Sequence, residues 1–195
     1  MDKVNIKIII GSTRKNRFSE KVAYWMSFVI KEFDDINWEF LDLRDYKLPF
    51  LEDENLDEKN LEIFNKWREK IEEGDGYLII SPEYNHSFPA VLKNNLDYLY
   101  KEWFYKPVTF ISYGSAGGAR SIEQLRLVSI ELRLIPLRNS LHLPREVIQE
   151  NKNNEEILKI LAAYNEKIKY CLKELSVMSK LLKEARMKNI FNELL

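Results

Sequence analysis

The stretch Val4-Asn5-Ile6-Lys7-Ile8-Ile9-Ile10-Gly11-Ser12-Thr13 predicts a buried strand that runs into a polar turn. Its first seven residues are mostly β-branched and apolar, a composition that favours strands. The glycine and the two hydroxyl residues that follow are typical of a turn. We therefore expect a strand over residues 4–10 and a loop that begins at residue 11.

Strand-like and helix-like segments alternate along the rest of the chain. Alternating polarity at 38–43 and short, mostly apolar stretches at 77–81, 107–112 and 135–137 indicate further strands. Between them, apolar residues recur with the 3.6-residue period of a helix. Five strands that alternate with helices predict an α/β fold, with a parallel sheet covered by helices on both faces.

Composition excludes several classes of function. The 195 residues carry 30 Lys plus Arg against 31 Asp plus Glu, a net charge of −1 that argues against nucleic-acid or membrane partners. No apolar run reaches the roughly 20 residues of a membrane helix, and the start does not resemble a signal peptide, so we expect a cytoplasmic protein. With one cysteine, Cys171, and two histidines, His86 and His142, no metal site is expected, and redox chemistry would need an organic cofactor.

We expect one domain over residues 1–195, with a C-terminal helical extension from about residue 176. The helical pattern after Asn154 would extend roughly 60 Å as one straight helix, which exceeds the width of a small domain. The helix must therefore break or find a partner. This tail, with its apolar residues Leu181, Leu182, Ile190, Phe191, Leu194 and Leu195, either packs on another subunit or folds back, and we expect a homodimer or homotetramer.

Three loops follow predicted strands and should meet at the carboxyl edge of the sheet, where open parallel sheets bind ligands. Loop one (residues 11–19) offers hydroxyls, backbone N–H groups, the guanidiniums of Arg14 and Arg17, and a helix N-terminus, as a phosphate requires. It matches neither Walker A nor Gly-x-Gly-x-x-Gly. Loop two (81–89) combines two prolines, an aromatic ring and an amide, which suit a planar ligand. Loop three (115–120) is glycine-rich, so its backbone can approach a ligand closely.

Each loop also has a plainer interpretation. Loop one is equally typical of a solvated helix start, loop two of a β–α connection built on Pro and Asn, and loop three of a turn that opens a helix. His86, in loop two, is either an ordinary turn residue or a neighbour of the nicotinamide or acceptor. The convergence of the three loops on one sheet edge favours the ligand interpretation.

The motifs in these loops resemble those of the NADPH-dependent FMN reductases of flavodoxin-like fold, which include quinone, azo-dye and chromate reductases. The resemblance runs from residue 4 to about 150, and His86-Ser87-Phe88 and the tail beyond Ser176 depart from the family pattern. The motifs are Gly11-Ser12-Thr13-Arg14 with Ser19; Pro82-Glu83-Tyr84-Asn85 continuing into Leu92-Lys93-Asn94-Asn95-Leu96-Asp97-Tyr98-Leu99; and Gly114-Ser115-Ala116-Gly117-Gly118-Ala119-Arg120 with Gln124-Leu125-Arg126.

The resemblance implies a three-layer sandwich with a five-stranded parallel sheet of order 2-1-3-4-5 and non-covalently bound FMN. It places the phosphate, the isoalloxazine ring and the pyrimidine side of the flavin at loops one, two and three in turn. No side chain is expected to act as an acid or base, because the flavin N5 carries the chemistry. The residues concerned are Ser12, Arg14, Phe18 and Ser19 for the phosphate; Pro82, Glu83, Tyr84 and Asn85 for the ring; and Ser115, Gly117 and Gly118 for the pyrimidine side.

The implied activity is an FMN-dependent NAD(P)H oxidoreductase. Hydride would pass from NADPH or NADH to the flavin, and then to a small acceptor in ping-pong order. The acceptor could be free flavin, a quinone, an azo compound or a metal oxyanion. One alternative is a flavin-binding electron carrier or redox-sensing module without nicotinamide activity. A third hypothesis is a nucleotide-hydrolysing or phosphate-transferring domain. The absence of a Walker lysine from the sequence argues against it.

Overall fold

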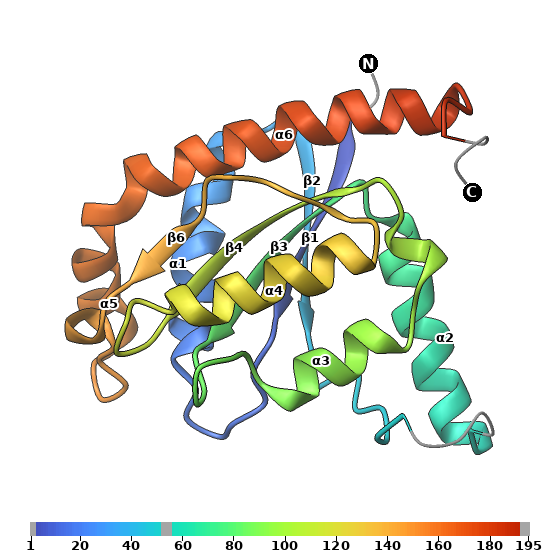
Figure 1. Cartoon of the computed structure of the whole chain (residues 1–195). Helices are drawn as coiled ribbons and strands as arrows, with labels where there is room; N and C mark the ends of the chain where they lie inside the picture. The colour runs from blue at the N-terminus through green and yellow to red at the C-terminus, as the bar shows by residue number, and fades with distance from the viewer. Residues whose placement is uncertain (1–2, 52–55, 192–195) are drawn as a thin grey trace.

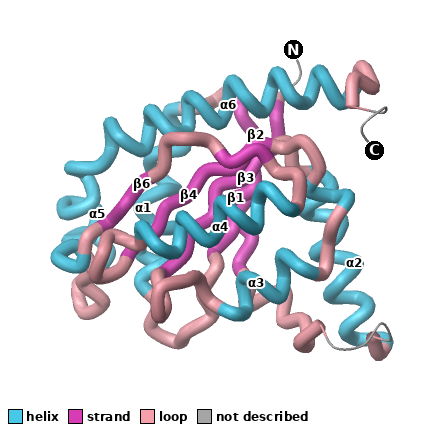
Figure 2. Tube along the Cα trace, in the orientation of Figure 1, coloured by secondary structure: helices cyan, strands magenta, loops and turns pink. Residues whose placement is uncertain are grey.

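The computed structural model describes residues 3–51 and 56–191. A parallel sheet forms its centre (Figures 1 and 2). The strand order β2-β1-β3-β4-β5 confirms the predicted order. The strands are β1 (Val4–Ile10), β2 (Ile36–Asp42), β3 (Gly76–Pro82), β4 (Pro107–Tyr113), β5 (Ile135–Pro136) and β6 (Leu141–Leu143).

Helices cover both faces of the sheet, as the alternation predicts. Figure 1 shows α3 and α4 in front of the strands and α1 behind them. In β1, Ile8 packs with α1, α5 and α6, whereas its neighbour Ile9 packs with α2, α3 and α4. A strand buried on both faces must be apolar at successive positions, which explains its unbroken run of isoleucines. The helices are α1 (Phe18–Val29), α2 (Glu58–Glu73), α3 (Ala90–Asp97), α4 (Ala119–Glu131), α5 (Asn154–Leu161) and α6 (Asn165–Met187).

The sheet edge beyond β4 differs from the prediction of a single fifth strand. β5 pairs with the start of β4, and β6 then pairs with its end, so two short parallel strands share one edge. In the segment between β5 and β6, the backbone carbonyls accept hydrogen bonds from side chains of β4 and α4. Thr109 Oγ1 donates to the Asn139 oxygen at 2.7 Å, and Arg126 donates to the oxygens of Leu137 and Arg138. The consequence is a further loop, after β6, at the carboxyl edge.

The C-terminal helical region breaks once, at a 3-10 turn over Ala162–Tyr164. After it, α6 continues through residue 176 without interruption and packs on the chain's own sheet. Near its end, Lys183 Nζ and Arg186 Nη2 each donate to the Asp75 carboxylate at 2.9 Å. The Phe191 ring stacks on Tyr105 with 4.1 Å between centroids. The tail therefore folds back on its own chain, although Leu181 and Ile190 remain exposed; Leu194 and Leu195 lie outside the described residues.

Two structural findings concern the classes of function considered above. No helix within the described ranges is long and apolar enough to cross a membrane. Within the same ranges, no group of three or more His, Cys, Asp or Glu side chains is placed to hold a metal ion. Cys171 is buried against α6 neighbours, and burial raises the pKa of its thiol to about 11.

Candidate functional site

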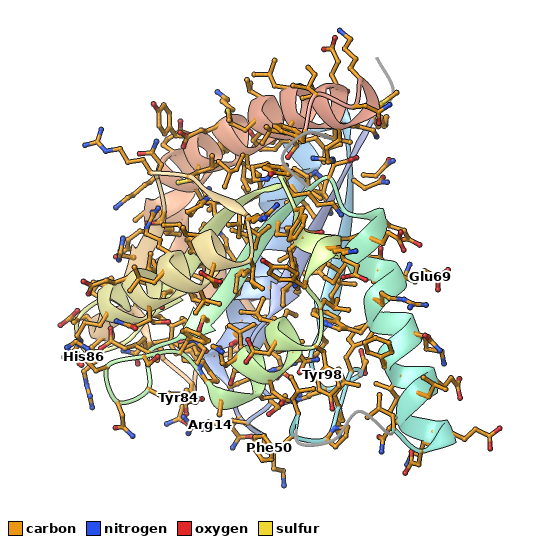
Figure 3. The ribbon with its side chains drawn as sticks, turned by 45° about the vertical axis from the view of Figure 1, so that its right-hand side comes forward. Arg14, Phe50, Glu69, Tyr84, His86 and Tyr98 are labelled. Atoms are coloured by element: carbon orange, nitrogen blue, oxygen red, sulfur yellow. The ribbon has the colours of Figure 1, made fainter. Side chains whose placement is uncertain are left out.

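Loops at the carboxyl ends of the strands enclose an open cleft of about 1260 Å³. Its walls come from loops one, two and three and from the segment after β6, residues 144–151, which we name loop four. Figure 3 shows Arg14, Tyr84 and His86 at this end of the molecule. The lining residues are Arg14, Arg17, Phe18, Pro82, Glu83, Tyr84, Asn85, His86, Tyr113, Gly114, Ser115, Arg120, Arg145, Glu146, Ile148, Gln149, Glu150 and Asn151.

Most of the site residues predicted from the sequence border this cleft. Arg14, Phe18, Pro82, Glu83, Tyr84, Asn85 and Ser115 line it. The remaining four, Ser12, Ser19, Gly117 and Gly118, are not among the lining residues, and both serines are buried. The structure therefore brings all three predicted loops to one site, but it gives the buried serines internal partners.

Loop one is held by guanidiniums that bind its carbonyl groups. Arg17 donates to the Ser12 oxygen, and Arg44 donates to the oxygens of Thr13, Arg14 and Lys15. In a planar trans peptide, each N–H points away from the carbonyl of the residue before it. The N–H groups of residues 13–16 therefore point away from the two guanidiniums, and none of them has a hydrogen-bond partner among the described residues.

Arg17 is a buried structural residue, unlike the solvent-facing cation that loop one suggests in the sequence. Its Nη1 donates to Asp42 Oδ1 at 2.7 Å and its Nη2 donates to Asp42 Oδ2. Burial alone would raise the pKa of Asp42, but the hydrogen bonds from Arg17 outweigh it and lower that pKa. The pair fixes loop one to the end of β2, while the buried Arg17 Nε has no hydrogen-bond partner among the residues that the structure describes.

Arg14 and Lys15 are both exposed cations of loop one, and of these two Arg14 lines the cleft. Its guanidinium lies 5.9 Å from the centroid of the Tyr84 ring, and a hydrogen bond with the Tyr84 hydroxyl raises the pKa of Arg14. The same hydroxyl lies 3.2 Å from Ser12 Oγ. Tyr84 thus joins loop two to loop one at the mouth of the cleft.

A tight turn at Asn85-His86 sets the shape of loop two. Tyr84 and Ser87 exchange two backbone hydrogen bonds, of 2.8 and 2.9 Å. Both residues between them have positive φ, 45° at Asn85 and 74° at His86. Two positive φ angles characterise a type I′ turn, and Asn and His are among the non-glycine residues that adopt positive φ most often. The structure therefore places His86 at the exposed tip of a turn on the rim of the cleft.

Glu83 connects loop two to loop three. Its Oε2 accepts from the Arg120 N–H, in the first turn of α4, at 3.1 Å, and its Oε1 pairs with the Arg120 guanidinium. Gly118, the residue just before α4, has φ of 72°, and a Cβ there would lie 2.1 Å from Ser112 Oγ. Glycine is required at this position both by conformation and by space.

Below the cleft, the Ser19 and Tyr113 hydroxyls lie 2.7 Å apart, and Phe18 packs edge-on against the Tyr113 ring. Burial raises the pKa of Tyr113, so the phenol stays protonated at neutral pH. This buried hydrogen bond fixes the first turn of α1, whose N-terminus has no side-chain cap. Because no described side chain caps it, this helix N-terminus can contribute to binding an anion.

Loop four is the wall that the sequence reasoning missed. Arg145, Glu146, Gln149, Glu150 and Asn151 all line the cleft from this segment. The signal was present in Leu141-His142-Leu143, which alternates in polarity as a short strand would. Recognition of that strand would have placed the next loop at the carboxyl edge with the other three.

The donor groups of the cleft fit a planar cofactor that carries a phosphate. Unpaired N–H groups, the α1 N-terminus and Arg14 supply what a phosphate dianion needs. In addition, the buried Nε atoms of two lining residues, Arg17 and Arg120, have no hydrogen-bond partner among the described residues. Buried donors normally have partners, so these orphans indicate a site built for a ligand.

Comparisons with known proteins identify the family. A family model described as NADPH-dependent FMN reductase matches residues 4–146. An NAD(P)H-dependent FMN reductase of Schizosaccharomyces pombe is 34% identical over 150 residues, which cover 73% of this chain and 75% of that protein. A 2-hydroxy-1,4-benzoquinone reductase of Burkholderia sp is 31% identical over 139 residues, covering 68% of this chain and 73% of that protein. The solved structure of the flavoenzyme NAD(P)H:(acceptor) oxidoreductase from Paracoccus denitrificans shares the fold, with a TM-score of 0.59 at 20% identity over 86% of this chain and 98% of that one. The chain therefore belongs to the NADPH-dependent FMN reductase family.

Proposed function

We propose that this protein binds FMN in the cleft and uses it to transfer electrons from NADPH or NADH to a small acceptor such as a quinone. The observation that carries the proposal is loop one, whose four outward N–H groups have no partner among the described residues and lie beside an exposed arginine. Bound FMN supplies reversible two-electron chemistry at its N5. A hydride from the nicotinamide and a proton from water together convert a quinone to a hydroquinone.

The chain's own contribution is to bind and orient. The N–H groups of residues 13–16 and the α1 N-terminus, which begins at Phe18, would hold the FMN phosphate together with Arg14. Ser12 and Ser19 act from beneath, through their contacts with Tyr84 and Tyr113. A fixed set of donors costs no reorganisation when charge arrives, which is the advantage of a loop already held by Arg17 and Arg44.

Loops two and three would flank the flavin ring. The backbone of Pro82, Glu83, Tyr84 and Asn85 would follow the ring, and the left-handed glycines Gly117 and Gly118 would bring loop three, with Ser115, toward the pyrimidine side. The Glu83–Arg120 pair fixes the distance between these two walls. N–H donors at the pyrimidine side would stabilise the negative charge of reduced flavin.

A homo-oligomer is part of this proposal. The loop after β2 presents two apolar side chains, Phe50 at 69% and Leu51 at 52% exposure. Asn94 holds this loop by accepting from the Leu51 N–H at 3.0 Å and donating to the Pro49 oxygen at 2.7 Å. Phe50 lies at the same end of the molecule as Arg14 and Tyr84 (Figure 3). Light scattering after size-exclusion chromatography tests the assembly, and a monomer would contradict it.

The visible spectrum of the purified protein, followed by anaerobic addition of NADPH, tests the proposed activity. We expect a flavin spectrum, or uptake of added FMN, and rapid bleaching by NADPH. Flavin uptake without bleaching by NADPH or NADH would instead identify an electron carrier. A protein that takes up no FMN would refute the proposed function.

A further inference from the structure

Four arginines line the cleft, and their charges are not equally engaged. Arg17 is paired with Asp42, and Arg120 is paired with Glu83. Arg14 lies against the Tyr84 ring at the phosphate loop. Arg145, on loop four, is exposed, and its guanidinium makes no hydrogen bond or ion pair with any described residue. The charge of Arg145 is therefore available to a ligand in the cleft.

The backbone that carries Arg145 is fixed. The Val147 N–H donates to the Pro144 oxygen at 3.1 Å, and the Ile148 N–H donates to the Arg145 oxygen at 3.0 Å, which closes a 3-10 turn. From α1, Lys21 Nζ donates to the Lys152 oxygen at 2.5 Å and ties the end of loop four to the helix. Arg145 is thus presented from a rigid base, which lowers the entropy cost of binding a ligand.

The size of the cleft leaves room for a second ligand. At about 1260 Å³ it exceeds the roughly 300–1,000 Å³ of typical small-molecule pockets. The cofactor phosphate is assigned to loop one, between β1 and α1, whereas Arg145 lies in the segment between β6 and α5. Two separate walls therefore carry the two lining arginines, Arg14 and Arg145, that form no ion pair with a described carboxylate.

We propose that Arg145 binds a phosphomonoester of the ligand that enters the cleft beside the bound cofactor, an inference that rests on the proposed function. A guanidinium binds such a dianion with two parallel hydrogen bonds. Two ligands of the proposed reaction carry this group: NADPH, at its 2′-phosphate, and free FMN, when it serves as the acceptor. NADH and riboflavin are the matched ligands that lack it.

Two carboxylates on the same loop oppose an anion. Glu146 and Glu150 line the cleft and have no ion-pair partner among the described side chains. Arg145 offsets their repulsion, so its removal leaves loop four acidic. Glu150→Gln is consequently the variant of opposite sign, and it should strengthen binding of the same phosphorylated ligands.

The experiment compares steady-state kinetics of wild type, Arg145→Gln, Arg145→Lys and Glu150→Gln. Arg68→Gln is the control, because Arg68 is an exposed arginine on α2 that does not line the cleft. For Arg145→Gln we expect the KM for NADPH, for FMN as acceptor, or for both to rise roughly tenfold, the size of one lost charged hydrogen bond. The KM values for NADH and riboflavin should stay unchanged. Arg145→Lys should fall between, and Glu150→Gln should lower the same KM values.

Three results would overturn the assignment. Unchanged KM values for both phosphorylated ligands would refute a role in binding, and equal rises for NADPH and NADH would place Arg145 at the pyrophosphate instead. Loss of bound FMN from Arg145→Gln, seen in the visible spectrum while Arg68→Gln stays yellow, would assign Arg145 to the cofactor. A wild-type protein without FMN uptake would refute the proposed function itself, and the spectrum would reveal this before any variant is compared.

Discussion

The buried pair of Arg17 and Asp42 offers a direct test of how the phosphate loop is held. The Arg17 side chain is 1% exposed and that of Asp42 is 27% exposed. Removal of one partner from a fully buried pair costs about 3–5 kcal/mol. Because Asp42 is partly solvated and Arg17 retains the Ser12 carbonyl, we expect Asp42→Asn to lower the free energy of unfolding by about 2–3 kcal/mol.

The same substitution should weaken FMN binding, because loop one would lose its anchor to β2. Each 1.4 kcal/mol of added ordering cost corresponds to a tenfold loss of affinity, so we expect a Kd for FMN roughly ten times higher. Urea unfolding and a flavin fluorescence titration measure the two effects. Asp45→Asn is the control, since Asp45 is exposed on the same turn and forms no ion pair with any described residue. An Asp42→Asn protein that matches Asp45→Asn in both assays would refute this account of the loop.

This pair also makes stability depend on pH in a defined direction. Because the pKa of Asp42 is lowered in the fold, its contribution is complete above the unfolded value of about 3.9 and is lost as the pH falls through the lower folded value. The wild type should therefore lose stability in this acidic range more steeply than Asp42→Asn. Equal acid profiles of the two proteins would contradict the assignment.

Further predictions concern three other positions. Gly118→Ala should lower the free energy of unfolding by about 2–5 kcal/mol, because its Cβ would meet Ser112 at a positive φ, and weak FMN uptake should accompany this loss; a stable, yellow variant would be contrary to this. Burial lowers the pKa of Lys106 to about 7, whereas the unfolded chain keeps this lysine protonated to about pH 10, so the unfolded state binds more protons and stability should rise with pH between these values. Lys106→Met should flatten this rise of the free energy of unfolding with pH, measured in denaturant titrations. An unchanged pH dependence in the variant would contradict the role given to Lys106. His86→Gly should raise stability by up to about 1 kcal/mol with turnover unchanged, because glycine adopts the positive φ of this position at no steric cost, and a large fall in kcat would give His86 a role beyond the turn.

Much of the fold could be predicted because the central strands are apolar at successive positions, which indicates burial on both faces. The isoleucine run of β1 and the apolar β3 can only be strands covered on both faces, and their spacing with helical segments determines a parallel sheet. The divided edge could not be predicted in the same way. It depends on tertiary hydrogen bonds from Thr109 and Arg126 to backbone carbonyls, and such contacts leave no local pattern.

The site shows the same division between local and tertiary information. The loops were predictable because they follow strands, and topology brings the ends of parallel strands together. The roles of the individual arginines were not predictable, because nothing in the local sequence distinguishes Arg14 from Arg17. Burial of Arg17 depends on Asp42, which lies 25 residues away on β2. Loop four was missed because its strand is three residues long and resembles a loop.

The most direct test of the central claim is an anaerobic stopped-flow record of flavin absorbance in the FMN-loaded protein. The account predicts rapid bleaching when NADPH or NADH is mixed with the protein, and full return of the colour when a quinone is added in a second mix. A flavin band that remains unchanged after both nicotinamides, or an enzyme that stays bleached in the presence of every quinone and flavin acceptor, would contradict it.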